Sequence, residues 1–253
     1  FGIPYTVLVG GAGRGWDKLG PPGKKARKAD RLAVEAALEE VFAEVDATVN
    51  EWNPESHASQ LNATPAGVPF ALSRPLCDVL GVSSIVHRAL RGKFDPTIAP
   101  LSAAWTTALE AGSVLPQDRI EELRASTGFE RLGFDPDASL VVKEQSGVAV
   151  DLGGVSKGWA VDEIVLRLTS AEGGLGLQSI VCEWGGDIKA VGSHPYRGGP
   201  WVVGLERPPP LEVLFANFEA ASTVAEAGGD GAVPVSPSTA PPLAPLELAS
   251  VRL

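Results

Sequence analysis

The chain has 253 residues, of which 44% are hydrophobic, so it is long enough to bury a sizeable core. Its formal net charge of -10 argues against a nucleic-acid or anionic-membrane partner, because either would favour a basic face. No apolar run reaches about 18 residues, so the sequence predicts no transmembrane segment.

The cysteines and histidines show no spacing typical of a metal or redox motif. Cys77 and Cys182 are far apart in the sequence, so we expect two buried thiols. The three histidines also lack the spacing of metal ligands. The chain begins at Phe1 and contains no methionine, so we expect that its first residue is not the initiator.

The first part of the chain predicts a strand, a glycine-rich loop and two helices. Residues 5–9 are typical of a strand, and the loop at 10–15 follows. The loop does not match the dinucleotide fingerprint, because Trp16 stands where the last glycine is needed. Apolar residues keep helical spacing over 30–49 and 75–90, and Pro75 suits the first turn of the second helix.

The second part alternates less regularly. An apolar run at 148–150 predicts a strand, and a helix follows from 159 to 168. Further strands are predicted at 180–184, 188–191, 201–205 and 213–218, with turns at 185–186 and 208–210. This order indicates an α+β fold. Five prolines between Val233 and Pro245 predict a loop or an extended arm.

Residues 151–158 read Asp-Leu-Gly-Gly-Val-Ser-Lys-Gly and lie between the predicted strand and helix. A helix N-terminus offers free N–H groups and a positive dipole end, and glycine lets an anion approach the backbone. The segment therefore predicts an anion site. A glycine-rich turn with a surface lysine explains the same eight residues equally well.

Three other polar segments each allow a structural interpretation as well. Residues 51–56 and 59–62 are typical of a capped turn. Residues 92–97 fit a helix stop followed by a turn, and 184–188 fit a tight hairpin. The functional interpretation depends on the four segments occurring together, in this order.

Taken together, these segments resemble the ApbE family of flavin transferases, which are FAD:protein FMN transferases. The matching segments lie at 1–5, 54–62, 94–101, 151–158, 185–188 and 248–251. The resemblance implies an α+β, ApbE-like two-lobed fold with mixed and antiparallel sheets and flanking helices. It also implies a domain over 1–232, to which the proline-rich arm and terminal strand at 233–253 belong.

The family cleaves the pyrophosphate of FAD with magnesium and joins FMN through a phosphoester to a threonine or serine of a partner flavoprotein. Such phosphoryl transfer needs a cation, donors around the diphosphate, an aromatic slot for the flavin and a base. The resemblance therefore implies that FAD and magnesium bind here and that a protein partner accepts FMN.

The family's site residues carry over to positions in three parts of this chain. Phe1 and Trp52 would line the flavin slot. Lys93, Phe94 and Asp95 would hold FAD, in its adenosine half. Around the 151–158 motif, the positions are Asp151 as a hydrogen-bond acceptor from the cofactor, Gly154 with its backbone carbonyl near magnesium, and Lys157 beside the diphosphate or substrate as the catalytic candidate.

Late in the chain, the sequence departs from the family pattern. Residues 225–230 lack the two hydroxyls of the family's Ala-Thr-Ser-Gly-Asp, and 233–240 lack its histidine and aspartate. The family's metal-binding aspartate and threonine follow the strand near which this chain stops, at Leu253. Hard cations favour carboxylate oxygen, so such losses weaken magnesium binding.

These departures lead to two alternative expectations. The first is a degenerate relative that serves as a structural or accessory subunit of a larger, respiratory assembly in the mitochondrion. The alternative is an active, magnesium-dependent FAD:protein FMN transferase of the bacterial periplasm or the cell-envelope exterior.

Overall fold

The computed structural model describes residues 4–12, 24–194 and 198–204. The chain forms two compact units, Phe1–Gly199 and Pro200–Leu253, and nearly all the described residues belong to the first. The predicted boundary between 232 and 233 lies outside the described residues, as do the predicted strand at 213–218 and the proline-rich arm. Among the described helices, none is long and apolar enough to cross a membrane.

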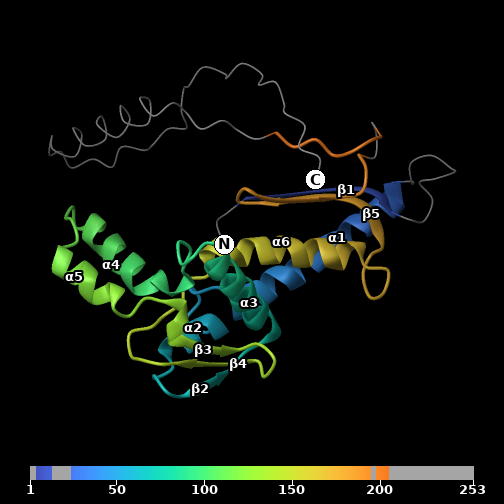
Figure 1. The fold of residues 1–253 in the computed structure, drawn as a ribbon. Helices are drawn as coiled ribbons and strands as arrows, with labels where there is room; N and C mark the ends of the chain where they lie inside the picture. Colours follow the sequence, from blue (N-terminus) through green and yellow to red (C-terminus); the bar gives the residue numbers. More distant parts are fainter. Residues whose placement is uncertain (1–3, 13–23, 195–197, 205–253) are drawn as a thin grey trace, which may run out of the picture. The chain divides into compact units, whose positions relative to one another are not determined.

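Helices and short strands make up the first unit (Figure 1). The described helices are α1 (Lys24–Thr48), α2 (His57–Ala63), α3 (Arg74–Ala89), α4 (Ala99–Glu110), α5 (Gln117–Arg124) and α6 (Gly153–Thr169), with 3-10 turns at Pro96–Ile98 and Phe129–Arg131. The strands are β1 (Tyr5–Ala12), β2 (Pro69–Ala71), β3 (Leu132–Asp135), β4 (Leu140–Lys143), β5 (Leu177–Trp184) and β6 (Asp187–Val191). They form two antiparallel sheets, of order β1-β5-β6 and β2-β4-β3, which confirms the predicted α+β class.

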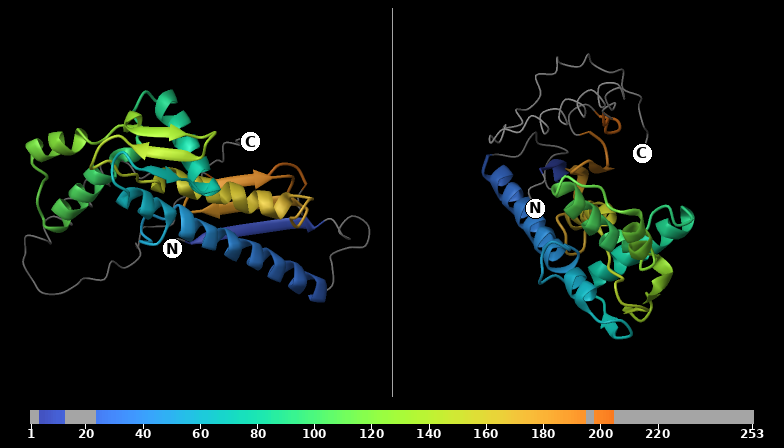
Figure 2. Two further views of the ribbon diagram at one scale, coloured as in Figure 1. Left: turned by 90° about the horizontal axis from the view of Figure 1, so that it is seen from below. Right: turned by 90° about the vertical axis from the view of Figure 1, so that its left-hand side faces the viewer.

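Helix α6 packs on the first sheet and touches the elements around it. It contacts strands β5 and β6 and also helices α1 and α3. Helix α1 lies next to α6 in the views of Figures 1 and 2. Alternate residues Ile180, Cys182 and Trp184 of β5 are at most 1% exposed. The ring centroid of Phe42 in α1 lies 5.1 Å from that of Trp184. Burial of this apolar face supplies most of the packing energy of the layer.

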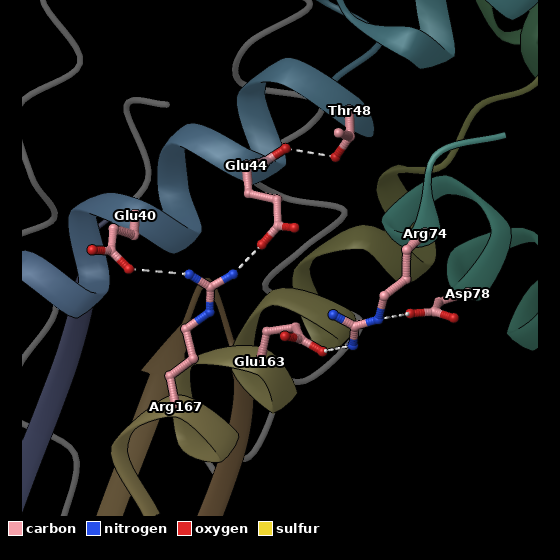
Figure 3. Close-up of polar contacts among 7 residues, drawn as sticks. All are labelled: Glu40, Glu44, Thr48, Arg74, Asp78, Glu163 and Arg167. Atoms are coloured by element: carbon pink, nitrogen blue, oxygen red, sulfur yellow. Dashed lines mark hydrogen bonds and ion pairs between the residues drawn. The ribbon is translucent and has the colours of Figure 1, made fainter. Parts of the chain in front are cut away.

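Ion pairs also fix α6 to its neighbours. Glu163 has a side chain only 9% exposed and receives the guanidinium of Arg74 from α3 at 2.6 Å. A buried carboxylate needs such a partner, since an unpaired charge is costly away from water. The other pairs that reach α6 are Arg167 with Glu40 and Glu44 of α1, shown with the first pair in Figure 3, and Asp162 with Lys189 of β6.

The second sheet closes over the end of α2. Val141 of its central strand is fully buried, and Lys143 of the same strand is only 5% exposed. The Lys143 ammonium donates to the backbone carbonyl of Asn62 at 2.7 Å. Burial lowers the pKa of Lys143 from its ordinary value. The lysine thus ties β4 to the C-terminal turn of α2.

The sequence predictions for the long elements are confirmed. The expected helices at 30–49, 75–90 and 159–168 correspond to α1, α3 and α6, although α1 begins earlier, at Lys24, and α6 begins earlier, at Gly153. The expected turn at 185–186 joins β5 to β6, and both glycines there have positive φ, of 57° and 93°. The pattern did not reveal α2, α4, α5 or the second sheet, whose elements are short or weakly periodic.

Two predicted strands are wrong within the described residues. Residues 201–204 form no strand. Residues 148–150 are extended but unpaired with any strand, because the side chain of Asn62 takes the place of a neighbouring strand. Its amide donates to Val150 O at 2.9 Å and accepts from Val150 N at 2.7 Å.

Candidate functional site

The turn that leads into α6 is held on both sides. Val150, before the turn, is paired with the amide of Asn62. Asp151 donates its backbone N–H to Pro96 O at 2.7 Å, and its Oδ1 accepts from Gly153 N at 3.1 Å.

Helix α6 begins at Gly153, and both Gly153 and Gly154 are exposed. The N–H of Gly153 is taken by Asp151, and those of Val155 and Ser156 both donate to Leu152 O at 2.9 Å. The N–H of the exposed Gly154, which has no hydrogen bond among the described residues, is the one that an anion could take.

Side chains from two other segments gather over this helix start. A Cβ placed on Gly154 would lie 3.3 Å from Cε2 of the Phe94 ring. A Cβ on Gly153 would lie 3.3 Å from Asp151 Oδ1 and 3.4 Å from Glu51 Oε1. The two glycines thus make room for an aromatic ring and two carboxyls close to the backbone.

Glu51 is a residue of this site that the sequence analysis placed only in a capped turn. Burial raises the pKa of its carboxyl above the ordinary value, and the charge of Asp151 adds to the rise. The backbone N–H groups of Glu51 itself and of Gly153 act in the opposite direction. Only its tertiary contact with Asp151 distinguishes Glu51 from a surface glutamate, and no sequence signal carries that contact.

Trp52 follows Glu51 and stands out from the surface with 86% of its area exposed. Its loop is rigidly tied to the end of α1, because Asn50 Nδ2 and Asn53 Nδ2 donate to the two oxygens of Asp46 at 2.8 and 2.9 Å. Ser56 then caps α2 by accepting from Ser59 N at 3.1 Å, which confirms the predicted capped turn. An exposed indole on a fixed loop is suited to stacking with a planar ligand.

The carboxylate of Asp95 accepts hydrogen bonds from nearby groups of the protein itself. Asp95 Oδ1 accepts from the N–H of Thr97 at 2.9 Å and from its hydroxyl at 2.5 Å. Its Oδ2 accepts from Phe129 N at 3.2 Å. His87 Nδ1 lies 2.9 Å from Phe94 O. The carboxylate of Asp95 is thus used within the protein, and it places Phe94 against α6.

Three predicted site residues remain, namely Lys157, Lys93 and Phe1. Lys157 lies in the second turn of α6, is partly buried and makes no ion pair with another described residue. Lys93 is exposed, and its backbone N–H closes a turn onto Leu90 O at 3.2 Å. Phe1 lies outside the described residues. The structure therefore brings Phe94, Asp151 and Gly154 together with Glu51 at the start of α6, and it places Trp52 as the exposed neighbour of Glu51 in the chain.

The described residues alone do not form a magnesium site. Magnesium prefers several oxygen ligands in octahedral geometry, and carboxylates usually supply the charge. Within the described ranges, no group of three or more histidine, cysteine, aspartate or glutamate side chains could hold a metal ion. The carbonyl of Gly154 and the facing carboxyls of Asp151 and Glu51 fall short of such a set.

The chain is similar to proteins of one family along most of its length. The model of the ApbE family matches residues 1–236. An FAD:protein FMN transferase of Chlamydia pneumoniae is 33% identical over 175 residues, which are 68% of this chain and 53% of that protein. One from Chlamydia trachomatis is 31% identical over 222 residues, which are 87% of this chain and 63% of that protein. The chain thus spans between half and two thirds of these curated relatives.

Solved structures show the same similarity in the fold. The apo form of Pseudomonas stutzeri flavinyl transferase ApbE has a TM-score of 0.65 at 26% identity, over 81% of this chain and 58% of that one. The flavin transferase ApbE from Vibrio cholerae has a TM-score of 0.63 at 25% identity, over 82% of this chain and 62% of that one.

Proposed function

Because the chain belongs to the ApbE family, we propose that it is an FAD:protein FMN transferase, like its curated relatives by name. In this reaction a serine or threonine hydroxyl of a partner flavoprotein forms a phosphoester bond with the phosphorus of FMN. The pyrophosphate bond of FAD breaks and AMP leaves. The observation that carries the proposal is the meeting of Phe94, Glu51 and Asp151 at the start of α6, with the exposed Trp52 next to Glu51 in the chain.

The start of α6 suits the diphosphate of FAD. The positive dipole end and the exposed N–H of Gly154 favour a negative group, while the Phe94 ring and the carboxyls of Asp151 and Glu51 border the space above the two glycines. Lys157 follows one turn later on the same helix and forms no ion pair with another described residue, so its side chain could pair with the diphosphate. Fixed donors of this kind stabilise charge that develops on the transferred phosphoryl group.

Aromatic side chains support the flavin part of the proposal. Trp52 offers an exposed indole face on a loop that Asp46 holds in place. Phe94 lies against Gly154, directly over the helix start. Offset stacking on such rings fits the planar isoalloxazine. Asp151 offers a carboxylate oxygen as an acceptor for a flavin or ribityl donor.

The expectation of a degenerate accessory subunit is not supported. It rested on residues 225–240, which lie outside the described residues, and on the end of the chain. No finding indicates lost activity or a role in a respiratory assembly, and the named relatives favour the active transferase. The expected mitochondrial location stays a prediction, as does the dependence on magnesium.

The test is transfer of FMN by the full 253-residue chain. The protein is incubated with FAD, Mg²⁺ and an acceptor domain that carries the serine or threonine target. We expect a covalent flavin on the acceptor, seen by in-gel fluorescence and intact mass. Asp151→Ala and Lys157→Ala should each slow transfer by roughly 100-fold or more, because each removes a fixed polar group beside the reacting phosphate.

Lys189→Ala is the matched control. Lys189 is a lysine like Lys157, but it lies on β6 and forms an exposed ion pair with Asp162 at 2.5 Å. Such a pair is worth little, so this variant should transfer FMN like the wild type. A wild-type chain that binds FAD but transfers no FMN to the acceptor would contradict the proposed transferase activity.

A further inference from the structure

We propose that Asn62 is a positioning residue of the FAD site, whose side-chain amide holds the peptide of Val150 and so fixes Asp151 at the start of α6. The inference rests on the proposed function, and it assigns a task to a residue that touches neither the diphosphate turn nor the aromatic rings directly.

The amide of Asn62 engages both polar groups of one residue. Its Nδ2 donates to Val150 O at 2.9 Å, and its Oδ1 accepts from Val150 N at 2.7 Å. Val150 is 1% exposed, so its peptide has no ready access to water. Removing the amide would leave a buried donor and a buried acceptor unpaired, which the chain can relieve only by moving the segment.

The next residue along the chain is Asp151, so any such movement reaches it first. Apart from Asn62, the described hold on the Asp151 peptide is its N–H bond to Pro96 O at 2.7 Å. Asp151 must also present Oδ1 to Gly153 N and face Glu51. Without Asn62 the turn is anchored from one side, and the carboxylate loses its fixed position.

Asn62 is itself held by a hydrogen bond from β4. The buried ammonium of Lys143 donates to Asn62 O at 2.7 Å, and Lys143 is 5% exposed. At the other end of α2, the N-cap residue Ser56 comes just after the loop that carries Trp52. Helix α2 therefore connects the loop of the exposed indole to Val150, the residue just before the turn of Asp151, through the Asn62 amide.

The test measures FAD affinity of the full chain and two variants by quenching of flavin fluorescence. Asn62→Ala removes both bonds, and we expect FAD to bind roughly 10- to 100-fold more weakly, since small displacements of binding groups have effects of this size. Asn62→Asp keeps the acceptor for Val150 N but turns a carboxylate oxygen towards Val150 O, which repels it, so this variant should also bind FAD more weakly than the wild type. If the alanine variant fails to fold, this isosteric variant carries the test.

Gln60→Ala provides the control on the same helix. Gln60 also donates through its amide, from Nε2 to Glu55 O at 2.9 Å, but it is exposed and its bond is to Glu55 and not to Val150. This variant should bind FAD like the wild type. Thermal unfolding of every protein shows whether a loss of affinity accompanies a general loss of structure.

A double-mutant cycle separates positioning from general destabilisation. If Asn62 acts through Asp151, then Asn62→Ala should weaken binding much less in an Asp151→Ala background than in the wild type. An equal factor in both backgrounds would mean that Asn62 acts elsewhere, and it would overturn the inference. Wild-type affinity in a folded Asn62→Ala protein would overturn it as well.

Hydrogen exchange tests the role of Asn62 separately from the proposed function. The Val150 amide should be protected in the wild type and exchange faster in Asn62→Ala, whatever ligand the site takes. Equal exchange would overturn the role of Asn62 alone. A wild-type chain that binds no FAD would instead overturn the proposed function and the positioning role that rests on it, while the exchange difference would still report the hold on Val150.

Discussion

Single residues at the start of α6 differ in how much of their role lies in their own chemistry. Asp95 uses both carboxylate oxygens on the backbone and hydroxyl of its own loop and on Phe129, and so acts by placing Phe94. Asp151 keeps a partly exposed carboxylate at the helix start. Glu51, which faces Asp151, is the residue whose charge state depends most clearly on its surroundings.

The titration of Glu51 predicts a dependence of stability on pH. Its pKa is raised in the folded protein, chiefly by burial and then by Asp151, so the native state holds this proton more tightly than the unfolded chain. The resulting stability is complete below the unfolded value of about 4.3 and is lost as the pH rises through the folded pKa. Glu51→Gln stays neutral, so it should be more stable than the wild type at neutral pH.

Urea unfolding at a series of pH values measures this difference. The advantage of Glu51→Gln should shrink as the pH falls towards the unfolded pKa, where the wild-type carboxyl is protonated in both states. Glu55→Gln, at an exposed position on the same loop, is the control. A stability difference that is independent of pH, or that grows at low pH, would show that Glu51 does not hold a raised pKa.

At the scale of elements, α6 links the candidate site to the rest of the first unit. Its first turn contains Gly153 and Gly154, and its later turns hold the ion pairs to α1, α3 and β6. The pairs differ in burial, because the Glu163 side chain is 9% exposed while Asp162 is 61% exposed. Buried pairs affect stability most when one partner is removed.

Arg74→Met is therefore expected to destabilise the fold. It leaves Glu163 without its partner from α3, at a cost of about 1–3 kcal/mol in the free energy of unfolding. Arg31→Met is the matched control, since Arg31 pairs with Glu35 on an exposed face of α1, at 79% and 43% exposure. Its loss should leave the free energy of unfolding nearly unchanged, because a solvent-exposed pair contributes little. Guanidinium unfolding measures both, and equal costs would contradict the role of burial.

At the scale of the whole molecule, a ligand that binds only the native state must stabilise it. If FAD binds as proposed, a concentration of about 100 times its Kd should add about 2.7 kcal/mol to the free energy of unfolding. Thermal scans with increasing FAD should show a rising Tm, and the rise should be smaller for Asp151→Ala at each concentration. A Tm that FAD leaves unchanged in the wild type would argue against binding of FAD.

The sequence by itself determined the family and the long elements. Helices α1, α3 and α6 and strands β1, β5 and β6 follow from apolar periodicity over many residues, which tertiary contacts seldom override. The elements α2, α5 and β2–β4 were missed because they are short, and the 12-residue α4 was missed because it has no buried face and so only weak apolar periodicity. The four polar segments identified the family through their order along the chain.

Only the tertiary structure decided how those segments meet. Sequence patterning made 148–150 a strand, yet its hydrogen bonds go to Asn62, a residue 88 positions earlier than Val150. Glu51 becomes part of the site by facing Asp151, 100 positions later by residue number. Such contacts depend on where packed helices place single side chains, and local propensity contains no information about partners that are distant along the chain.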